Sequence, residues 1–161
     1  MKYISLSRGE RAIIDDEDYA YLSQWKWLVM TSGYAARNSL SREKKTGKGR
    51  MIWMHRVIMK TPKNMECDHI SRDRLDNRKS NLRNCTHQEN QWNAGKRKKG
   101  SFNSVFKGIE KQTSGSTWMA RIKIDGKRMY LGNFKTEKEA ALAYNQAAKK
   151  YHGEFAVLNQ L

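Results

Sequence analysis

The sequence predicts an α+β fold in three parts: a small N-terminal antiparallel sheet, a strand–loop–strand–helix segment, and a three-stranded antiparallel sheet backed by one helix. Short runs of alternating apolar and polar residues between turn residues are typical of antiparallel strands. One long helical pattern lies near the C-terminus. The chain has 161 residues, 38% of them hydrophobic and 30% charged, and such a short, charged chain favours small modules over one deep core.

The first 60 residues contain only short predicted elements. Two strands are expected over 3–14, and a helix over 16–23 begins with acidic residues that suit the positive end of a helix dipole. A second small antiparallel sheet is expected from three extended segments: 25–29, 33–37 and 50–54. A basic loop, 41–49, joins the last two strands, and a short helix over 55–60 ends before Pro62.

Residues 118–131 predict a β-hairpin, because an alternating strand runs into Asp125-Gly126, a two-residue turn signal. Counting outward from this turn fixes the register. The expected cross-strand pairs are Lys123 with Arg128, Ile122 with Met129, Arg121 with Tyr130, and Ala120 with Leu131. Since side chains alternate between faces, one face collects a basic and aromatic set: Arg121, Lys123, Arg128 and Tyr130.

A helix is predicted to cover the opposite, apolar face of this hairpin. Thr136 and Glu139 form a capping box at its start, and the helix ends near Gly153. A further strand over 105–111 completes a three-stranded sheet.

The charge balance indicates a polyanionic partner. With 32 Lys and Arg against 16 Asp and Glu, the formal net charge is +16, which predicts attraction to nucleic acid first and to a membrane surface second. No window approaches ~18 consecutive apolar residues, so no membrane span is expected. The N-terminus lacks an apolar signal core, and Cys67 and Cys85 form no disulfide framework. A cytoplasmic, reducing compartment is therefore expected.

The basic face of the hairpin suits double-stranded DNA, because a β-ribbon fits the major groove. The pair Lys123–Arg128 places like charges opposite each other, which lowers stability unless an anion binds. A merely solvated face is the alternative interpretation. Further basic residues of the linker and the first strand are candidate DNA contacts: Lys96, Arg97 and Lys107.

Five C-terminal sequence segments follow one another in the order and spacing of a known domain: Lys107 to Ile109, Trp118 to Ile122, Tyr130 to Phe134, Glu139 to Tyr144, and Gly153 to Asn159. Over 105–160 this series resembles the plant ethylene-response-factor (Apetala-two) DNA-binding domain. In that family the sheet enters the major groove, so the resemblance implies DNA contacts from the same basic face. Glu110 and Gln112 stand where the plant domains carry arginines in the first strand, so their base preference is not transferred.

Asp68, His69 and Asn90 are the candidate catalytic set. Cutting a phosphodiester requires a hard divalent cation with oxygen ligands and a base that titrates near neutrality. Asp68 and Asn90 supply oxygen, and His69, with an ordinary pKa of ~6.5, is largely neutral at pH 7. Because neighbouring strand residues point to opposite sides, the strand must end or bend at Asp68-His69. Simple turn chemistry of Asp and Asn is the alternative interpretation.

Four segments contain or surround these candidate catalytic residues: Met54-His55-Arg56, Cys67 to Ile70, Leu75 to Arg83, and Cys85 to Asn93. In order and spacing, residues 54–93 resemble HNH endonucleases of the homing type found in phages. The resemblance implies a ββα-metal fold in which Asp68 and Asn90 hold one Mg²⁺ or Mn²⁺, His69 is the general base and Asn81 braces the loop. It also implies 5′-phosphate and 3′-hydroxyl products, and a phage-encoded protein acting in a bacterial host cell.

The sequence thus predicts a sequence-tolerant, metal-dependent DNA endonuclease in four segments: an N-terminal module over 1–53, the nuclease motif over 54–93, a basic linker over 94–104 and a DNA-binding domain over 105–161. One chain holds one site, and a nicking monomer and a double-cutting homodimer both stay open. The alternatives from other classes are a non-catalytic, sequence-specific DNA-binding regulator and an RNA-binding protein.

Overall fold

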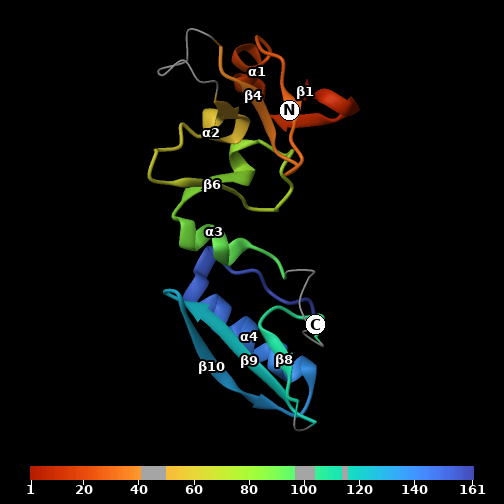
Figure 1. Ribbon diagram of the computed structural model, residues 1–161, viewed down its shortest axis with the longest axis vertical. Coiled ribbons are helices and arrows are strands. Elements are labelled where there is room, and N and C mark those ends of the chain that lie inside the picture. The colour runs from red at the N-terminus through yellow and green to blue at the C-terminus, as the bar shows by residue number, and fades with distance from the viewer. Residues whose placement is uncertain (41–49, 97–103, 114–115) are drawn as a thin grey trace. The chain divides into compact units, whose positions relative to one another are not determined.

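The computed structural model describes residues 1–40, 50–96, 104–113 and 116–161. The chain forms two compact units, Met1–His87 and Gln88–Leu161. Both mix short helices with small antiparallel sheets, as the sequence predicts (Figure 1). No helix among the described residues is both long and apolar enough to cross a membrane.

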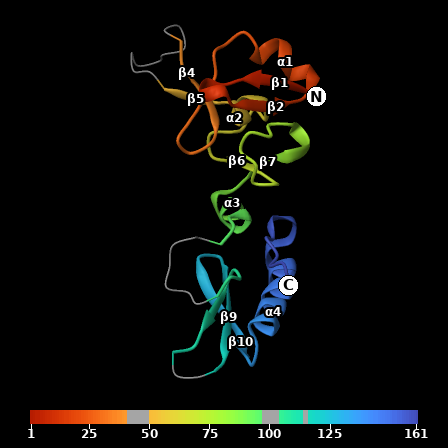
Figure 2. The same cartoon turned by 90° about the vertical axis from the view of Figure 1, so that its right-hand side faces the viewer.

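The first unit begins with a two-stranded antiparallel sheet of β1 (Lys2–Ser5) and β2 (Arg11–Ile14). A 3₁₀ turn over Ser7–Gly9 joins the strands. Helix α1 (Asp16–Leu22) follows, with three acidic residues in its first turn. Figure 2 shows α1 beside this sheet. The two strands and the helix predicted for this part of the chain are therefore confirmed.

A second sheet contains β3 (Leu28–Val29), β4 (Ala35–Asn38) and β5 (Met51–Trp53) in the order β3-β4-β5. The strand predicted over 25–29 is wrong in its first half. Trp27 is buried, and its indole N–H donates to the Leu22 carbonyl oxygen at 2.8 Å, so burial of the ring, rather than strand pairing, sets the backbone there. The predicted basic loop lies outside the described residues.

Helix α2 (Met54–Ile58) leads from this sheet into the predicted nuclease motif. There β6 (Glu66–His69) pairs antiparallel with β7 (Leu82–Cys85), and α3 (His87–Asn93) follows. The predicted strand–loop–strand–helix order is confirmed. Cys67 and Cys85 are both buried and are not joined in a disulfide.

One hydrophobic core extends through the described part of the first unit. Ile14, Leu22 and Trp27 pack with Met54 and Leu82, so segments on both sides of residue 53 bury the same apolar surface. Since burial of apolar side chains is the main stabilising term, the N-terminal sheets stabilise the motif that carries Asp68 and His69. The boundaries predicted between the four segments, after residues 53, 93 and 104, stay predictions.

The second unit has a three-stranded antiparallel sheet of β8 (Ile109–Lys111), β9 (Trp118–Ile124) and β10 (Lys127–Phe134), with β9 in the centre. The pairs Lys123–Arg128, Ile122–Met129 and Arg121–Tyr130 are confirmed. The pair Ala120–Leu131 is wrong, because the register shifts and Gly132 lies opposite Ala120. The shift is a β-bulge, which places one extra residue in one strand and which a count from the turn cannot foresee.

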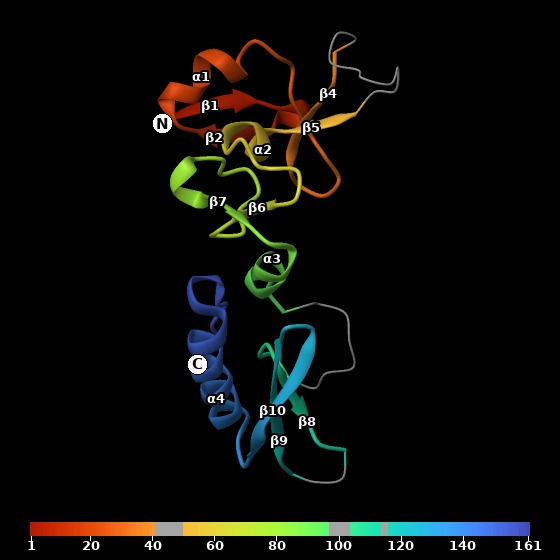
Figure 3. The same cartoon turned by 90° about the vertical axis from the view of Figure 1, so that its left-hand side faces the viewer.

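Helix α4 (Glu137–His152) covers the apolar face of this sheet (Figure 3). Its predicted capping box is present: the Thr136 side chain accepts from the Glu139 N–H, and the Glu139 carboxylate accepts from the Thr136 N–H. The helix ends at His152, before Gly153, as the sequence predicts. The opposite face of the sheet carries Arg121, Lys123, Arg128 and Tyr130.

Candidate functional site

Asp68 and His69 are the last two residues of β6 and are both buried. Arg83 lies directly opposite Asp68 on β7. Its Nε and Nη2 donate to the Asp68 Oδ2 atom at 3.0 and 2.8 Å, an ion pair that is largely shielded from solvent. Charge-assisted bonds of this kind fix the carboxylate in one orientation. The strand ends at His69, as the sequence required for this pair of residues.

The His69 ring is oriented by Asn77, which is fully buried. The Asn77 amide nitrogen donates to the Leu75 carbonyl oxygen at 3.1 Å, so its Oδ1 atom points to the imidazole. Oδ1 lies 3.4 Å from His69 Nε2. Because Oδ1 only accepts hydrogen bonds, this contact favours the neutral tautomer with the proton on Nε2 and the lone pair on Nδ1.

Asn81 contacts the loop after β6 rather than the imidazole itself. Its Oδ1 accepts from the Ser71 N–H at 2.9 Å, and its amide nitrogen donates to the Asp76 carbonyl oxygen at 2.8 Å. These bonds span the loop, as expected for a brace, and its role in catalysis stays a prediction. Sequence reasoning missed Asn77, although it stands four residues before Asn81 in the same asparagine-containing segment.

An aromatic enclosure surrounds His69. The His55 ring lies edge-on at 5.2 Å between centroids, and the Tyr34 ring lies at 5.5 Å. Trp53 stacks on His55 at 6.2 Å, and the Arg74 guanidinium lies over Tyr34 at 4.7 Å. The side chains come from separate segments, so the enclosure was not predicted. The sequence signal that bears on it is His55, in the segment Met54-His55-Arg56.

Burial lowers the pKa of both histidines. For His69, burial outweighs the Asn77 hydrogen bond and the nearby carboxylates of Asp68, Asp73 and Asp76, which act in the opposite direction. Both rings are therefore neutral at physiological pH, since a buried imidazole loses more hydration when charged. A neutral His69 is able to accept a proton.

Acidification is expected to destabilise the first unit through His55. Burial, with His69 and Arg56 nearby, lowers the pKa of His55 to about 3, against ~6.5 in an unfolded chain. Above pH 6.5 both states are neutral and stability is complete. As the pH falls towards 3, only the unfolded state takes up the proton, so the free energy of unfolding falls by about 2 kcal/mol at pH 5. Urea unfolding at pH 7.5 and pH 5 measures this loss.

The variant His55→Phe separates this contribution from other acid effects. It keeps an aromatic ring beside His69 and removes the titrating group, so its stability should fall less between the two pH values than that of the wild type. An equal fall in both proteins would contradict the assignment to His55.

Asn90 lies in α3 and belongs to the second unit, whereas Asp68 and His69 belong to the first. The C-terminal end of α3 is fixed by Lys107, whose ammonium donates to the carbonyl oxygens of Trp92 at 2.7 Å and Ala94 at 2.6 Å. Cations suit a helix C-terminus, where backbone carbonyls lack partners within the helix. Lys107 was predicted to bind DNA, and in this structure its ammonium caps a helix.

Two further contacts hold α3 within the second unit. The Trp92 ring stacks on His152 at 4.6 Å between centroids, and the His152 Nε2–H donates to the Lys123 carbonyl oxygen at 2.9 Å. At the other end of α3, the Gln88 amide donates to Asp125 at 2.7 Å. The helix that carries Asn90 is thus attached to the sheet and to α4.

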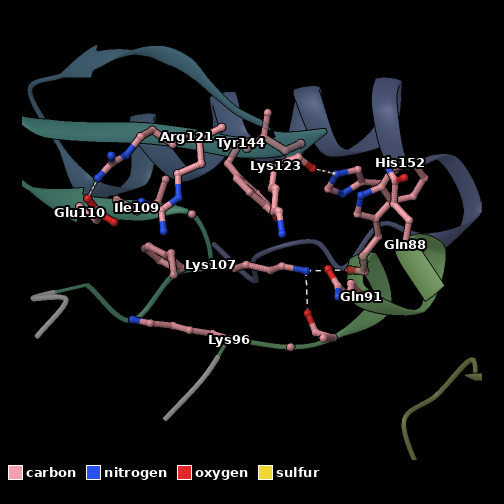
Figure 4. A pocket seen from close by; sticks show the side chains of 17 residues that line it. Gln88, Gln91, Lys96, Lys107, Ile109, Glu110, Arg121, Lys123, Tyr144 and His152 are labelled. Carbon is pink, nitrogen blue, oxygen red and sulfur yellow. Dashed lines mark hydrogen bonds and ion pairs between the residues drawn. The ribbon is translucent and has the colours of Figure 1, made fainter. Parts of the chain in front are cut away.

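The side chains of the predicted DNA-binding face differ in their exposure to solvent. Lys123, Arg128 and Tyr130 are exposed, whereas Arg121 is half-buried and forms an ion pair with Glu110. A cavity of about 360 Å³ lies beside this face, and Lys96 is among the residues that line it. Figure 4 shows Lys107 and Lys123 extending towards the same part of this cavity. Arg97 lies outside the described residues.

Asp68 and Asn90 both carry oxygen donors. A carboxylate and a carboxamide both present oxygen, the ligand that Mg²⁺ and Mn²⁺ prefer. The structure places Asp68 and His69 on β6 and Asn81 directly before β7, all within the first unit. The assignment of Asp68 and Asn90 as metal ligands stays a prediction.

Comparison with known proteins identifies the family. The HNH endonuclease family profile matches residues 50–92. An uncharacterized HNH endonuclease of Acanthamoeba polyphaga mimivirus is 32% identical over 154 residues, which cover 96% of this chain and 77% of the viral protein.

Two plant proteins also match. The AP2-like ethylene-responsive transcription factor ANT of Arabidopsis thaliana is 27% identical over 159 residues, covering 88% of this chain and 28% of that protein. The dehydration-responsive element-binding protein 2D of the same plant is 46% identical over 57 residues, covering 34% of this chain and 27% of its own length. The C-terminal region thus has AP2-like similarity, and the chain as a whole belongs to the HNH endonuclease family.

Proposed function

We propose that this protein is a metal-dependent endonuclease that hydrolyses double-stranded DNA, with His69 as the general base. The observation that carries the proposal is a buried, neutral imidazole at the end of β6, directly after a buried carboxylate. Membership of the HNH endonuclease family supports nuclease activity. The net charge of +16 supports a polyanionic substrate.

The chain's own residues supply the proton chemistry. Asn77 keeps His69 Nε2 protonated, so Nδ1 accepts the proton of the attacking water. The imidazolium that forms is stabilised by the negative charges of Asp68, Asp73 and Asp76. If the 3′-oxygen is the leaving group, the products carry 5′-phosphate and 3′-hydroxyl ends.

Asp68 and Asn90 are the residues proposed to hold one Mg²⁺ or Mn²⁺, which when bound polarises the scissile phosphate and stabilises charge on the leaving oxygen. Arg83 would keep Asp68 in the orientation that binding requires. Asn81 would keep the loop after β6 in place through its bonds to Ser71 and Asp76.

Cleavage of supercoiled plasmid tests this function. We expect nicked or linear DNA with Mg²⁺ or Mn²⁺, no cleavage with excess chelator, and restored cleavage when the metal is added back. Asp68→Asn and Asn90→Ala should each require more metal for half-maximal cleavage. Cleavage that persists in chelator, or variants with an unchanged metal requirement, would contradict the proposed site. The product pattern distinguishes a nicking monomer from a double-cutting homodimer.

A non-catalytic DNA-binding regulator is the second candidate. Its support is the similarity of the C-terminal region to proteins named as transcription factors. Tight, sequence-selective binding without cleavage under any metal condition would favour the regulator. A homing function in a phage, in the cytoplasm of its bacterial host, stays a prediction from the resemblance.

A further inference from the structure

Among the described residues, the basic face of the second unit carries one carboxylate, that of Glu110. Glu110 lies opposite Met119 in the β8–β9 register, and therefore on the same face as Arg121, two residues further along β9. Its Oε2 atom forms an ion pair with Arg121 Nη2 (Figure 4). The Glu110 and Arg121 side chains are 26% and 30% exposed, so the pair is accessible from the face and is not part of the core.

This ion pair is poorly suited to phosphate binding. A carboxylate repels phosphate, and its negative charge offsets the positive charge of the guanidinium, so the pair is neutral overall. Lys123 and Arg128 differ, because neither has an ion pair with another described residue, and both lie at the hairpin end of the same face. The cations that bind phosphate and the Glu110–Arg121 pair thus occupy different parts of one surface.

At the other end of the face, the described side chains Gln112, Met119 and Asn133 are uncharged. The Gln112 amide nitrogen lies 3.5 Å from Asn133 Oδ1 and 3.3 Å from Met119 Sδ. The face therefore changes from cations that form no ion pair with a described residue, at the hairpin turn, through the Glu110–Arg121 ion pair, to neutral amides. In protein–DNA interfaces cations on phosphate fix position, whereas carboxylates, amides and oriented guanidinium groups distinguish base edges.

We propose that Glu110 and Arg121 together determine the target sequence by contacting a C·G base pair in the major groove. Glu110 accepts from the cytosine N4 amino group, and Arg121, oriented by Glu110, donates to guanine O6 and N7. Lys123 and Arg128 bind the flanking phosphates and add affinity without selectivity. This inference rests on the proposed DNA-binding function and deepens it, since it names the residues that select the bases.

Selection from a randomised pool of 20-base-pair duplexes tests the proposal, with the full-length protein in chelator so that binding is measured without cleavage. We expect the wild type to enrich sequences that share a C·G pair. Glu110→Gln and Arg121→Gln should each lower the preference at that same pair, on the order of tenfold. In Glu110→Gln the freed Arg121 should also make non-specific binding tighter and more dependent on salt.

Lys123→Gln is the matched control on the same face. It should weaken binding to all sequences and reduce the salt dependence, while the enriched sequence stays the same. Thermal unfolding of each variant verifies that the sheet is intact. If the wild type enriches a sequence and Glu110→Gln enriches it equally well, this inference is wrong while the DNA-binding function stands. If the wild type binds no DNA, the proposed function fails and the inference fails with it.

Discussion

His69→Ala should lower the rate of DNA cleavage by about 10³-fold while DNA binding stays close to that of the wild type. A general base contributes typically 10²–10⁴-fold, and neutral His69 lies at the end of β6 with Nδ1 able to accept a proton. Single-turnover cleavage at saturating protein isolates the chemical step. A loss confined to binding, with the rate at saturation unchanged, would contradict the assignment.

The control separates catalysis from folding. His87 lies in the same unit but is exposed, and its Nδ1 atom is 2.7 Å from Glu66 Oε1, so His87→Ala should cleave almost normally. His69 is itself buried, and its replacement leaves a space beside Tyr34 and His55. Added imidazole is therefore expected to restore part of the lost rate. Restoration by imidazole is a result that a purely structural role for His69 would not produce.

Gly108→Ala should destabilise the second unit by about 3 kcal/mol or more. Gly108 has φ of +78°, and a Cβ there would overlap the Tyr144 ring and lie 2.5 Å from the Arg121 carbonyl oxygen. The backbone of central strand β9 cannot move away without breaking the Gly108–Arg121 hydrogen bond, which is 2.8 Å long. Thermal unfolding should show the midpoint lowered by more than about 10 °C.

Gly126→Ala provides the comparison for backbone strain alone. Gly126 has φ of +77°, almost the same as Gly108, but a Cβ there meets no atom within 4 Å. Its replacement should lower stability by only about 1 kcal/mol, the strain of a left-handed residue. Equal destabilisation by the two alanines would show that contact with Tyr144 and β9 is unimportant.

The candidate nuclease site was predictable only in part. Residue chemistry singled out Asp68, His69 and Asn90, and the resemblance to HNH endonucleases added Asn81. The structure places Asp68 and His69 on one strand and Asn81 in the adjoining loop. Asn77, which contacts the imidazole, was not singled out. In a loop of several asparagines, the residue that faces a given ring depends on how the loop closes, and sequence spacing carries no information about closure.

The predicted DNA-binding face was likewise predictable only in part. The turn at Asp125-Gly126 set the pairing near the hairpin end, including Arg121 opposite Tyr130. The bulge beyond Tyr130 was not foreseen, because it adds a residue to one strand without a distinct local signal. The ion pair between Glu110 and Arg121 joins two strands, so it too required the folded sheet.

By itself the sequence determined the elements whose signals act within a few residues: the hairpin turn, the capping box of α4 and the order of strands and helix around Asp68. The tertiary structure alone decided the burial of His55 and His69, the attachment of α3 through Lys107, and the pairing of Arg121 with Glu110. The physical reason is that turns and caps are satisfied by neighbouring backbone groups, whereas desolvation and ion pairing depend on segments far apart in the chain.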